Sequence, residues 1–271
     1  MVNVSNKHGE TVSDVLRATF EVGEEFLVVN PTAGTITELI DIAAADSGDT
    51  PHLRLLGTNR TLKDAFEEFL VASNAADLIE SGRLEVREAT LPQNTLLITA
   101  SAVFALVGTD RQAAALGSDH GAFVEAVTDA AEIDWDSAEE YSLRTPPLSR
   151  VRETLAEEIG DPSREEFDRL LRAVATADAG TEVDEVVVSL LVAGRNEVLL
   201  YDISRWGEYV GIASKATFSR TKTQLEEHGL IDTEKVPIDV GRPRLRLQLG
   251  DGYEDLDADE LVGAVRSALV G

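Results

Sequence analysis

Cysteine is missing from the sequence, which excludes disulfide bonds, thiolate nucleophiles and cysteine-ligated zinc or iron–sulfur sites. No apolar run approaches the ~20 residues of a membrane span, and the first residues lack the pattern of a signal peptide. Neither a glycine-rich phosphate loop nor an assignable Ser–His–Asp set is present. We therefore expect a soluble, cytoplasmic protein that is not an enzyme and has no catalytic residue, cofactor or membrane contact. The histidines show no metal-ligand spacing and stand at His8, His52, His120 and His228.

Lysine is scarce, whereas acidic residues are abundant and evenly spread. The 271 residues include 50 Asp and Glu against 24 Lys and Arg, for a formal net charge of −26. This balance, with Arg greatly exceeding Lys, is typical of proteins adapted to high internal salt, as in a halophilic archaeon. The Debye length falls to ~3 Å at 1 M salt, and counterion release then contributes little to DNA affinity. Binding to a polyanion under those conditions has to rest on short hydrogen bonds, shape and burial.

Residues 205–248 depart from this acidic background. They contain eight Lys or Arg and six Asp or Glu, a net charge of +2, and three of the five lysines of the chain. Their pattern predicts a helix, a turn, a second helix, a strand, a tight turn and a strand, which is the layout of a winged helix-turn-helix. A local positive exception in a chain that otherwise repels DNA favours DNA binding.

The second of these helices is predicted to read DNA. It starts near Ser214 and stops at Gly229, where a left-handed residue is favoured. Phe218 and Leu225 fall on one face at helical spacing and are expected in the core, with the stem of Lys222 along its edge. Another face carries side chains suited to base edges or phosphates, although a solvated amphipathic helix is the alternative. The predicted DNA contacts on this helix are Ser214, Lys215, Thr217, Ser219, Arg220, Thr221, Lys222 and Gln224.

The hairpin that follows is predicted to be the wing. Apolar and polar residues alternate in both strands, so one face is apolar, and Gly241 supplies the permissive backbone at the tip. Arg242 and Arg244 flank Pro243 there and are predicted to contact phosphates or the minor groove. An edge hairpin protected by charges is the alternative. The apolar positions are Val236, Ile238, Val240, Leu245, Leu247 and Leu249.

Residues 1–135 are predicted to form an α/β domain. Strands expected at 26–30, 53–56 and 84–87 alternate with helices, which indicates an open, mostly parallel sheet. Two further strands, at 96–99 and 103–107, are expected to close the sheet as a hairpin. The helices are expected at 12–20 and 37–45, from a cap at Thr61 toward residue 79, and around 121–131.

Residues 136–180 are predicted to be a helical linker that also serves dimerisation, followed by the winged helix-turn-helix domain at 181–250 and an amphipathic helix at 251–271. Ser163 and Glu166 fit a capping box. Because winged-helix regulators commonly read two half-sites, a homodimer is expected. Its candidate interfaces are the apolar stripe Phe167, Leu170, Leu171 and Val174 and the helix carrying Leu261, Val265 and Leu269.

Open α/β sheets bind ligands at the carboxyl ends of their strands. Two such ends here are small polar loops, and Arg60 is a cation able to hold a phosphate or carboxylate. We expect them to bind an anionic metabolite resembling a sugar phosphate, although two ordinary turn and cap sequences are the alternative. The predicted ligand-binding residues are Asn30, Thr32, Gly57, Thr58, Asn59 and Arg60.

Two stretches, Ser214–Leu230 and Val240–Arg244, resemble archaeal winged-helix transcription regulators. The whole chain is similar to the haloarchaeal TbsP family, named as suppressors of the sugar regulator TrmB. The resemblance implies a transcription factor of sugar and central carbon metabolism, with double-stranded DNA as partner. It also implies an amino-terminal domain like the sensor of TrmB regulators, without catalytic residues, although TrmB proteins carry the DNA module first.

Two other functions compete with a DNA-binding regulator. An enzyme can be built on the α/β domain with the winged helix binding a protein, but no nucleophile, metal set or phosphate loop can be assigned. An adaptor that uses the winged helix for protein contacts is the other alternative, and the local positive charge counts against it.

Overall fold

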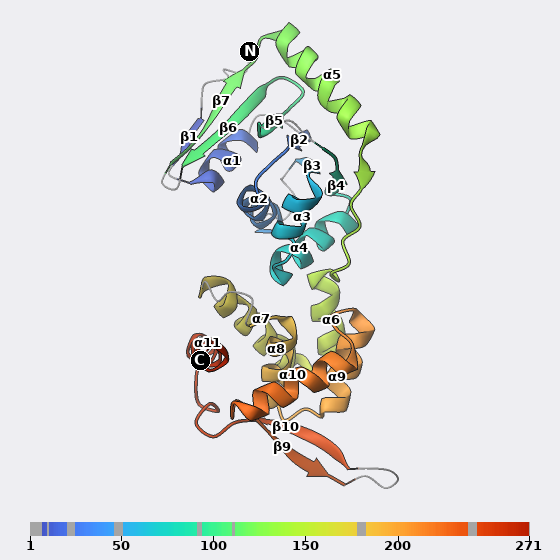
Figure 1. Ribbon diagram of the computed structural model, residues 1–271, viewed down its shortest axis with the longest axis vertical. Helices are drawn as coiled ribbons and strands as arrows, with labels where there is room; N and C mark the ends of the chain where they lie inside the picture. Colours follow the sequence, from blue (N-terminus) through green and yellow to red (C-terminus); the bar gives the residue numbers. More distant parts are fainter. Residues whose placement is uncertain are drawn as a thin grey trace. The chain divides into compact units, whose positions relative to one another are not determined.

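The computed structural model describes residues 7–9, 11–20, 25–45, 51–90, 94–109, 112–177, 183–237 and 243–270. The chain divides into two compact units, unit 1 at Met1–Leu143 and unit 2 at Arg144–Gly271 (Figure 1). An α/β unit comes first and a helical unit with a two-stranded hairpin follows. The predicted fold class is therefore confirmed.

Unit 1 is built on a sheet whose described strands run in the order β1-β7-β6-β5-β2-β3-β4-β8. Strands β2, β3 and β4 are parallel, and the other neighbours are antiparallel. The bounds are β1 Lys7–Gly9, β2 Glu25–Val29, β3 His52–Gly57, β4 Leu84–Glu88, β5 Leu96–Ile98, β6 Val103–Thr109, β7 Gln112–Ser118 and β8 Glu139–Glu140.

Helices cover both faces of this sheet. Because side chains alternate along a strand, Phe26 and Val28 of β2 face one core while Leu27 and Val29 face the other. The first core includes buried side chains from four helices, and the second is closed by the last helix. In order, the helices are α1 Val12–Phe20, α2 Ala33–Ala45, α3 Asn59–Ala65, α4 Phe69–Glu80 and α5 Gly121–Ser137.

The antiparallel part of the sheet is larger than the predicted hairpin of β5 and β6. Strands β7 and β1 extend it beyond β6, and β8 borders β4. Strand β7 was missed because Ala113–Ala115 offers no large or β-branched side chain to give a strand pattern. Pairing with β6 over the whole strand compensates for this weak local preference.

The helix predicted to start at a Thr61 cap starts earlier and is broken in two. Thr58 is the cap residue of α3, because its Oγ1 accepts a hydrogen bond from the Thr61 backbone N–H at 3.2 Å. Helix α3 then ends at Ala65, and α4 begins at Phe69. The apolar period continues through both helices, so the period alone does not reveal the break.

Unit 2 holds the helices that the sequence assigned to a linker as well as the winged helix. Helix α6 packs against α7 and α9, and α7 packs against α8 and α11. The predicted linker is thus divided, since β8 pairs with β4 in unit 1. The bounds are α6 Leu148–Glu158, α7 Asp161–Thr176, α8 Glu185–Arg195, α9 Leu200–Val210, α10 Lys215–Glu227, β9 Ile231–Val236, β10 Arg244–Leu249 and α11 Ala258–Val270.

Both apolar stripes proposed as dimer interfaces lie inside unit 2. Phe167 and Leu170 of α7 are fully buried, and so are Leu261 and Val265 of α11. These two helices pack on each other within one chain. The helical spacing correctly indicated buried faces, and within the described residues these faces pack on the same chain. Val174 and Leu269, which belong to the two stripes, are only half-buried.

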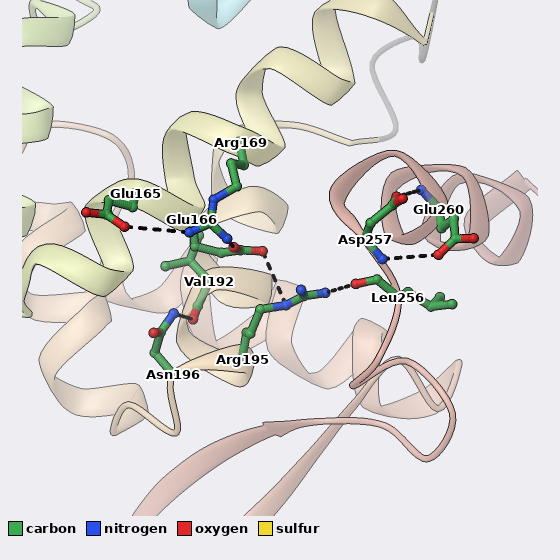
Figure 2. A network of polar contacts seen from close by, with 9 residues as sticks. All are labelled: Glu165, Glu166, Arg169, Val192, Arg195, Asn196, Leu256, Asp257 and Glu260. Atoms are coloured by element: carbon green, nitrogen blue, oxygen red, sulfur yellow. Dashed lines mark hydrogen bonds and ion pairs between the residues drawn. The ribbon is translucent and has the colours of Figure 1, made fainter.

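An ion-pair network around the buried Glu166 also attaches the segment before α11 to the rest of unit 2 (Figure 2). The side chain of Glu166, only 3% exposed, contacts Arg169 and lies 3.2 Å from Nε of Arg195. That 3.2 Å contact is an ion pair without hydrogen-bond geometry. Arg195 donates from Nη2 to the carbonyl oxygen of Leu256 at 2.7 Å, just before α11. The predicted capping box with Ser163 is wrong, because α7 begins at Asp161 and Glu166 points into the core.

Candidate nucleic-acid interface

Helices α9 and α10 form a helix-turn-helix with a very close crossing. Gly211 ends α9 with φ of 98°, a left-handed conformation that suits glycine. Ser214 caps α10 by accepting a hydrogen bond from the Thr217 backbone N–H at 3.2 Å. A Cβ on Gly207 would lie 2.3 Å from the ring of Phe218, so only glycine lets the two helices approach this far.

The exposed face of α10 is polar and slightly hollowed, with a volume of about 570 Å³. Arg220 and Gln224 lie on it, and their side chains make no hydrogen bond or ion pair with another described residue. Thr217 and Thr221, predicted on the same face, are only half exposed. The full lining is Ala216, Ser219, Arg220, Thr223, Gln224 and Glu227, of which Ala216, Thr223 and Glu227 were not predicted.

Lys222 does not belong to this face. Its side chain is buried, and its Nζ lies 2.6 Å from Oε2 of Glu226. Burial alone would raise the pKa of Glu226, but hydrogen bonds from Lys222 and Thr233 outweigh it and lower that pKa. Because Thr233 lies on β9 and donates its hydroxyl to Oε1 of Glu226, Glu226 connects α10 to the wing. Lys222 thus makes an internal ion pair on α10 rather than the predicted DNA contact.

Lys215 stands at the first turn of α10 and is half exposed. Its Nζ lies 2.9 Å from Oε2 of Glu208 on α9, and its backbone N–H donates to Oε1 of the same carboxylate. The hydrogen bond from the Lys215 side chain holds the pKa of Glu208 below its usual value. Glu208 thereby keeps Lys215 beside the start of α10 while leaving its charge accessible to solvent.

The wing has the predicted apolar face but a different first strand. Leu247 and Leu249 are buried, and β9 pairs with β10 with Ile231 opposite Leu249. Strand β9 starts directly after α10, whereas the predicted strand included Ile238 and Val240, which lie outside the described residues, as do Gly241 and Arg242. Arg244 is described, and its Cζ lies 3.6 Å from the ring centre of Tyr201.

The predicted ligand residues of unit 1 line two hollows that meet at Arg60. A hollow of about 330 Å³ includes Asn30, Thr32 and Arg60, and a second of about 680 Å³ includes Thr58, Asn59 and Arg60. Gly57 is buried behind them. The larger hollow is acidic, being lined also by Glu88, Asp134 and Glu139, and Asn59 is hydrogen-bonded to Glu88.

The described residues contain no group of three or more His, Cys, Asp and Glu arranged to hold a metal ion. A search of the same residues for a helix long and apolar enough to span a membrane finds none. These results concern only the part of the chain that the structure describes.

Comparison with known proteins identifies the family. Among solved structures, the chain is similar to TrmBL2, an archaeal chromatin protein reported to show a novel mode of DNA binding, at 20% sequence identity and a TM-score of 0.37. That match covers 52% of this chain and 56% of the other, so the chain spans little more than half the length of TrmBL2. No curated protein matches. One family model, the amino-terminal domain of TbsP-like transcriptional regulators, matches residues 4–146, and another, their carboxy-terminal HTH domain, matches residues 147–266. The chain therefore belongs to the TbsP-like family of transcriptional regulators.

Proposed function

We propose that this regulator binds double-stranded DNA in a sequence-dependent way, with α10 in the major groove and the wing beside it. The observation that carries the proposal is the exposed face of α10. It presents Arg220 and Gln224 without a partner among the described residues, in a chain whose net charge is −26. In so acidic a protein, an exposed helix face that carries an unpaired arginine favours binding to a polyanion over simple contact with solvent.

The spacing of these two side chains suits base reading. Residues four apart on a helix are separated by about 6 Å along its axis, which is close to two base-pair steps of ~3.4 Å. Arg binds guanine O6 and N7 in the major groove, and Gln binds adenine N6 and N7. We therefore expect a preferred half-site with a guanine and an adenine about two steps apart.

A gel-shift titration at one fixed salt concentration tests the proposal. Arg220→Ala should weaken binding to the preferred duplex by roughly 1–3 kcal/mol and reduce discrimination against a changed guanine. Arg150→Ala is the matched control, because Arg150 is an exposed arginine on α6 with the same charge. Equal affinities for wild type and Arg220→Ala would remove the proposed recognition face.

We also propose that unit 1 senses a metabolite with one anionic group and several hydroxyls, such as a sugar phosphate, and that the targets are genes of sugar and central carbon metabolism. Arg60 is 92% exposed and is the single cation among the residues that line either hollow. Asn30 adopts a left-handed φ of 49°, its backbone N–H donates to the carbonyl of Leu56, and its carbonyl accepts a hydrogen bond from the Thr95 hydroxyl. Such a rigid polar loop beside a cation supports a ligand site.

Thermal-shift measurements with sugar monophosphates and the matching free sugars test this second proposal. A phosphorylated sugar should raise the melting temperature of the wild type and have a smaller effect on Arg60→Ala. Asp64 lies 3.8 Å from Arg60, so Asp64→Asn is expected to strengthen binding. Equal stabilisation of wild type and Arg60→Ala would place the ligand elsewhere, and no stabilisation by any sugar would end the sensor proposal.

We propose further that the regulator is a homodimer, because DNA sites read as two half-sites match a two-fold protein. With α7 and α11 internal, the supporting surface is the uncovered face of β6 and β7. Val107 and Leu116, 52% and 48% exposed, lie there on neighbouring strands. Light scattering should give a dimeric mass for the wild type and a monomeric mass for Leu116→Glu. A monomeric wild type at micromolar concentration would contradict the proposal.

A further inference from the structure

A groove lies in unit 2 where α9, α10 and the wing meet. Its volume is about 400 Å³, and it opens to solvent. Cations stand on two of its elements, Lys215 on α10 and Arg244 on β10, with the serine hydroxyls of α9 and α10 lining it as well. None of its lining residues is acidic, which is unusual in this chain. They are Leu200, Tyr201, Ser204, Lys215, Ser219, Pro243, Arg244 and Leu245.

The ring of Tyr201 holds Arg244 in this groove. The guanidinium carbon lies 3.6 Å from the ring centre, the shortest of the cation–ring distances among the described residues. A planar guanidinium stacks on an aromatic face and keeps its N–H groups directed outward at the edge. Arg246, two residues further along β10, is instead paired with Glu234 across the hairpin at 3.4 Å. Arg244 thus differs from its neighbour in being fixed by a neutral ring rather than neutralised by a carboxylate.

Backbone hydrogen bonds hold the segment that carries Tyr201 against the strand that carries Arg244. Leu247 of β10 donates its N–H to the carbonyl of Val198 at 3.0 Å, and Leu199 forms a bridge with Arg246. Tyr201 follows two residues after that bridge, at the start of α9. The stack therefore connects the wing to the helix-turn-helix at a point where the backbone is already anchored.

We propose that this groove receives a backbone phosphate of duplex DNA and that Tyr201 is a positioning residue that orients Arg244 toward it. The proposal rests on the DNA binding proposed above and adds a residue that has no contact with bases. Phosphates are spaced along the edge of the major groove occupied by a recognition helix. Arg244 supplies positive charge, Lys215 adds a cation that is paired with Glu208 at 2.9 Å, and Ser219 supplies a hydroxyl donor. The Ser204 hydroxyl already donates to the carbonyl of Tyr201. At high salt such fixed, short contacts matter more than diffuse charge.

The test measures DNA affinity against KCl concentration for single and double variants. The probe is a duplex selected by the wild-type protein from a random-sequence library. Tyr201→Phe keeps the ring and should bind within about twofold of wild type. Tyr201→Ala should bind about 2- to 5-fold more weakly, since an exposed cation–ring contact is worth that much. Arg244→Ala should lower the slope of log affinity against log salt by about one, as expected for the loss of one phosphate contact.

The double variant separates positioning from a general structural role. If Tyr201 acts through Arg244, Tyr201→Ala should add nothing to Arg244→Ala and should itself lower the salt slope. Tyr209→Ala is the matched control, because Tyr209 is an exposed tyrosine on the same helix outside the groove. A thermal melt of each variant checks that it is folded.

The outcomes of this test are distinct. An unchanged salt slope in Tyr201→Ala, additive losses in the double variant, or an equal loss in Tyr209→Ala would each overturn the positioning role. The DNA-binding proposal itself would survive any of these results, and it would fail only if Arg220→Ala also left binding unchanged or if wild type selected no duplex.

Discussion

Replacing Gly207 by alanine should destabilise unit 2, against the usual effect of this substitution in a helix. Within a helix, alanine is favoured over glycine by about 0.5–1 kcal/mol. Here the new Cβ would lie 2.3 Å and 2.4 Å from two ring atoms of Phe218. Because Phe218 is fully buried, its ring has no free space to enter, and an extra methyl group in a packed core costs about 1–3 kcal/mol. We expect a net loss of about 1–2 kcal/mol.

The chain offers a built-in reporter and a matched control for this prediction. It contains two tryptophans, Trp135 in unit 1 and Trp206 in unit 2. In a Trp135→Phe background, fluorescence therefore follows the unfolding of unit 2 through the buried Trp206 alone. Gly263→Ala is the control, since Gly263 lies in α11 with nothing within 4 Å of a new Cβ. It should stabilise by about 0.5–1 kcal/mol.

Urea titrations of these variants give the free energies. Gly207→Ala should lower the thermal midpoint of unit 2 by about 3–10 °C, and adding Phe218→Leu should recover part of the loss because the two sites are in contact. Gly207→Ala should also weaken DNA binding, because the crossing of α9 and α10 sets the direction of the helix proposed to read DNA. A Gly207→Ala variant as stable as Gly263→Ala would refute the reasoning that a close helix crossing requires glycine.

Three further predictions concern charged side chains. Glu166→Gln removes the buried counter-charge of Arg195, which is itself 23% exposed, and should cost unit 2 about 1–3 kcal/mol in urea unfolding. A loss below about 0.5 kcal/mol would mean that the network is dispensable. Partial burial, and then repulsion from Asp41, raises the pKa of Glu68, whose side chain is still exposed. A raised carboxyl pKa disfavours the fold as the pH rises above the pKa of the unfolded chain, so Glu68→Gln should slightly raise the melting temperature of unit 1 at neutral pH, with the gain vanishing below about pH 4. The hydrogen bond from Arg54 lowers the pKa of Glu132. The stabilisation that this bond gives to unit 1 is therefore present at neutral pH and is lost as the pH falls through the lowered pKa of Glu132. Glu132→Gln should be less stable than wild type at neutral pH and equal to it in strong acid.

Local signals in the sequence placed helix α10 well. Ser214 caps the start of α10, and Gly229, with a left-handed backbone conformation, follows its end. Both effects depend only on residues close in the sequence, so the bounds of the helix could be predicted from the sequence. Phe218 and Leu225 are buried as their spacing predicted. Lys222 also lies toward that buried side, but its ion pair with Glu226 depends on a side-chain conformation that spacing does not give.

Signals that depend on distant partners were harder to interpret. The stripe on α7 correctly predicted burial, yet the pattern cannot say whether the covering surface is α11 of the same chain or a second subunit. Glu166 fitted a local capping rule, while its actual partner Arg195 lies on another helix. Tyr201 carried no signal at all, because its contact with Arg244 joins two elements that lie far apart in the sequence. Contacts made across the fold leave no periodicity in the sequence around one residue.

Selection of bound duplexes from a random-sequence DNA library tests the central claim most directly. Wild type and the control Arg150→Ala should enrich the same motif, containing a guanine and an adenine about two base-pair steps apart. Arg220→Ala should enrich duplexes in which the guanine position has become degenerate while the rest of the motif remains. A wild type that enriches no motif, or an Arg220→Ala variant that enriches the unchanged motif, would contradict the account that α10 reads DNA.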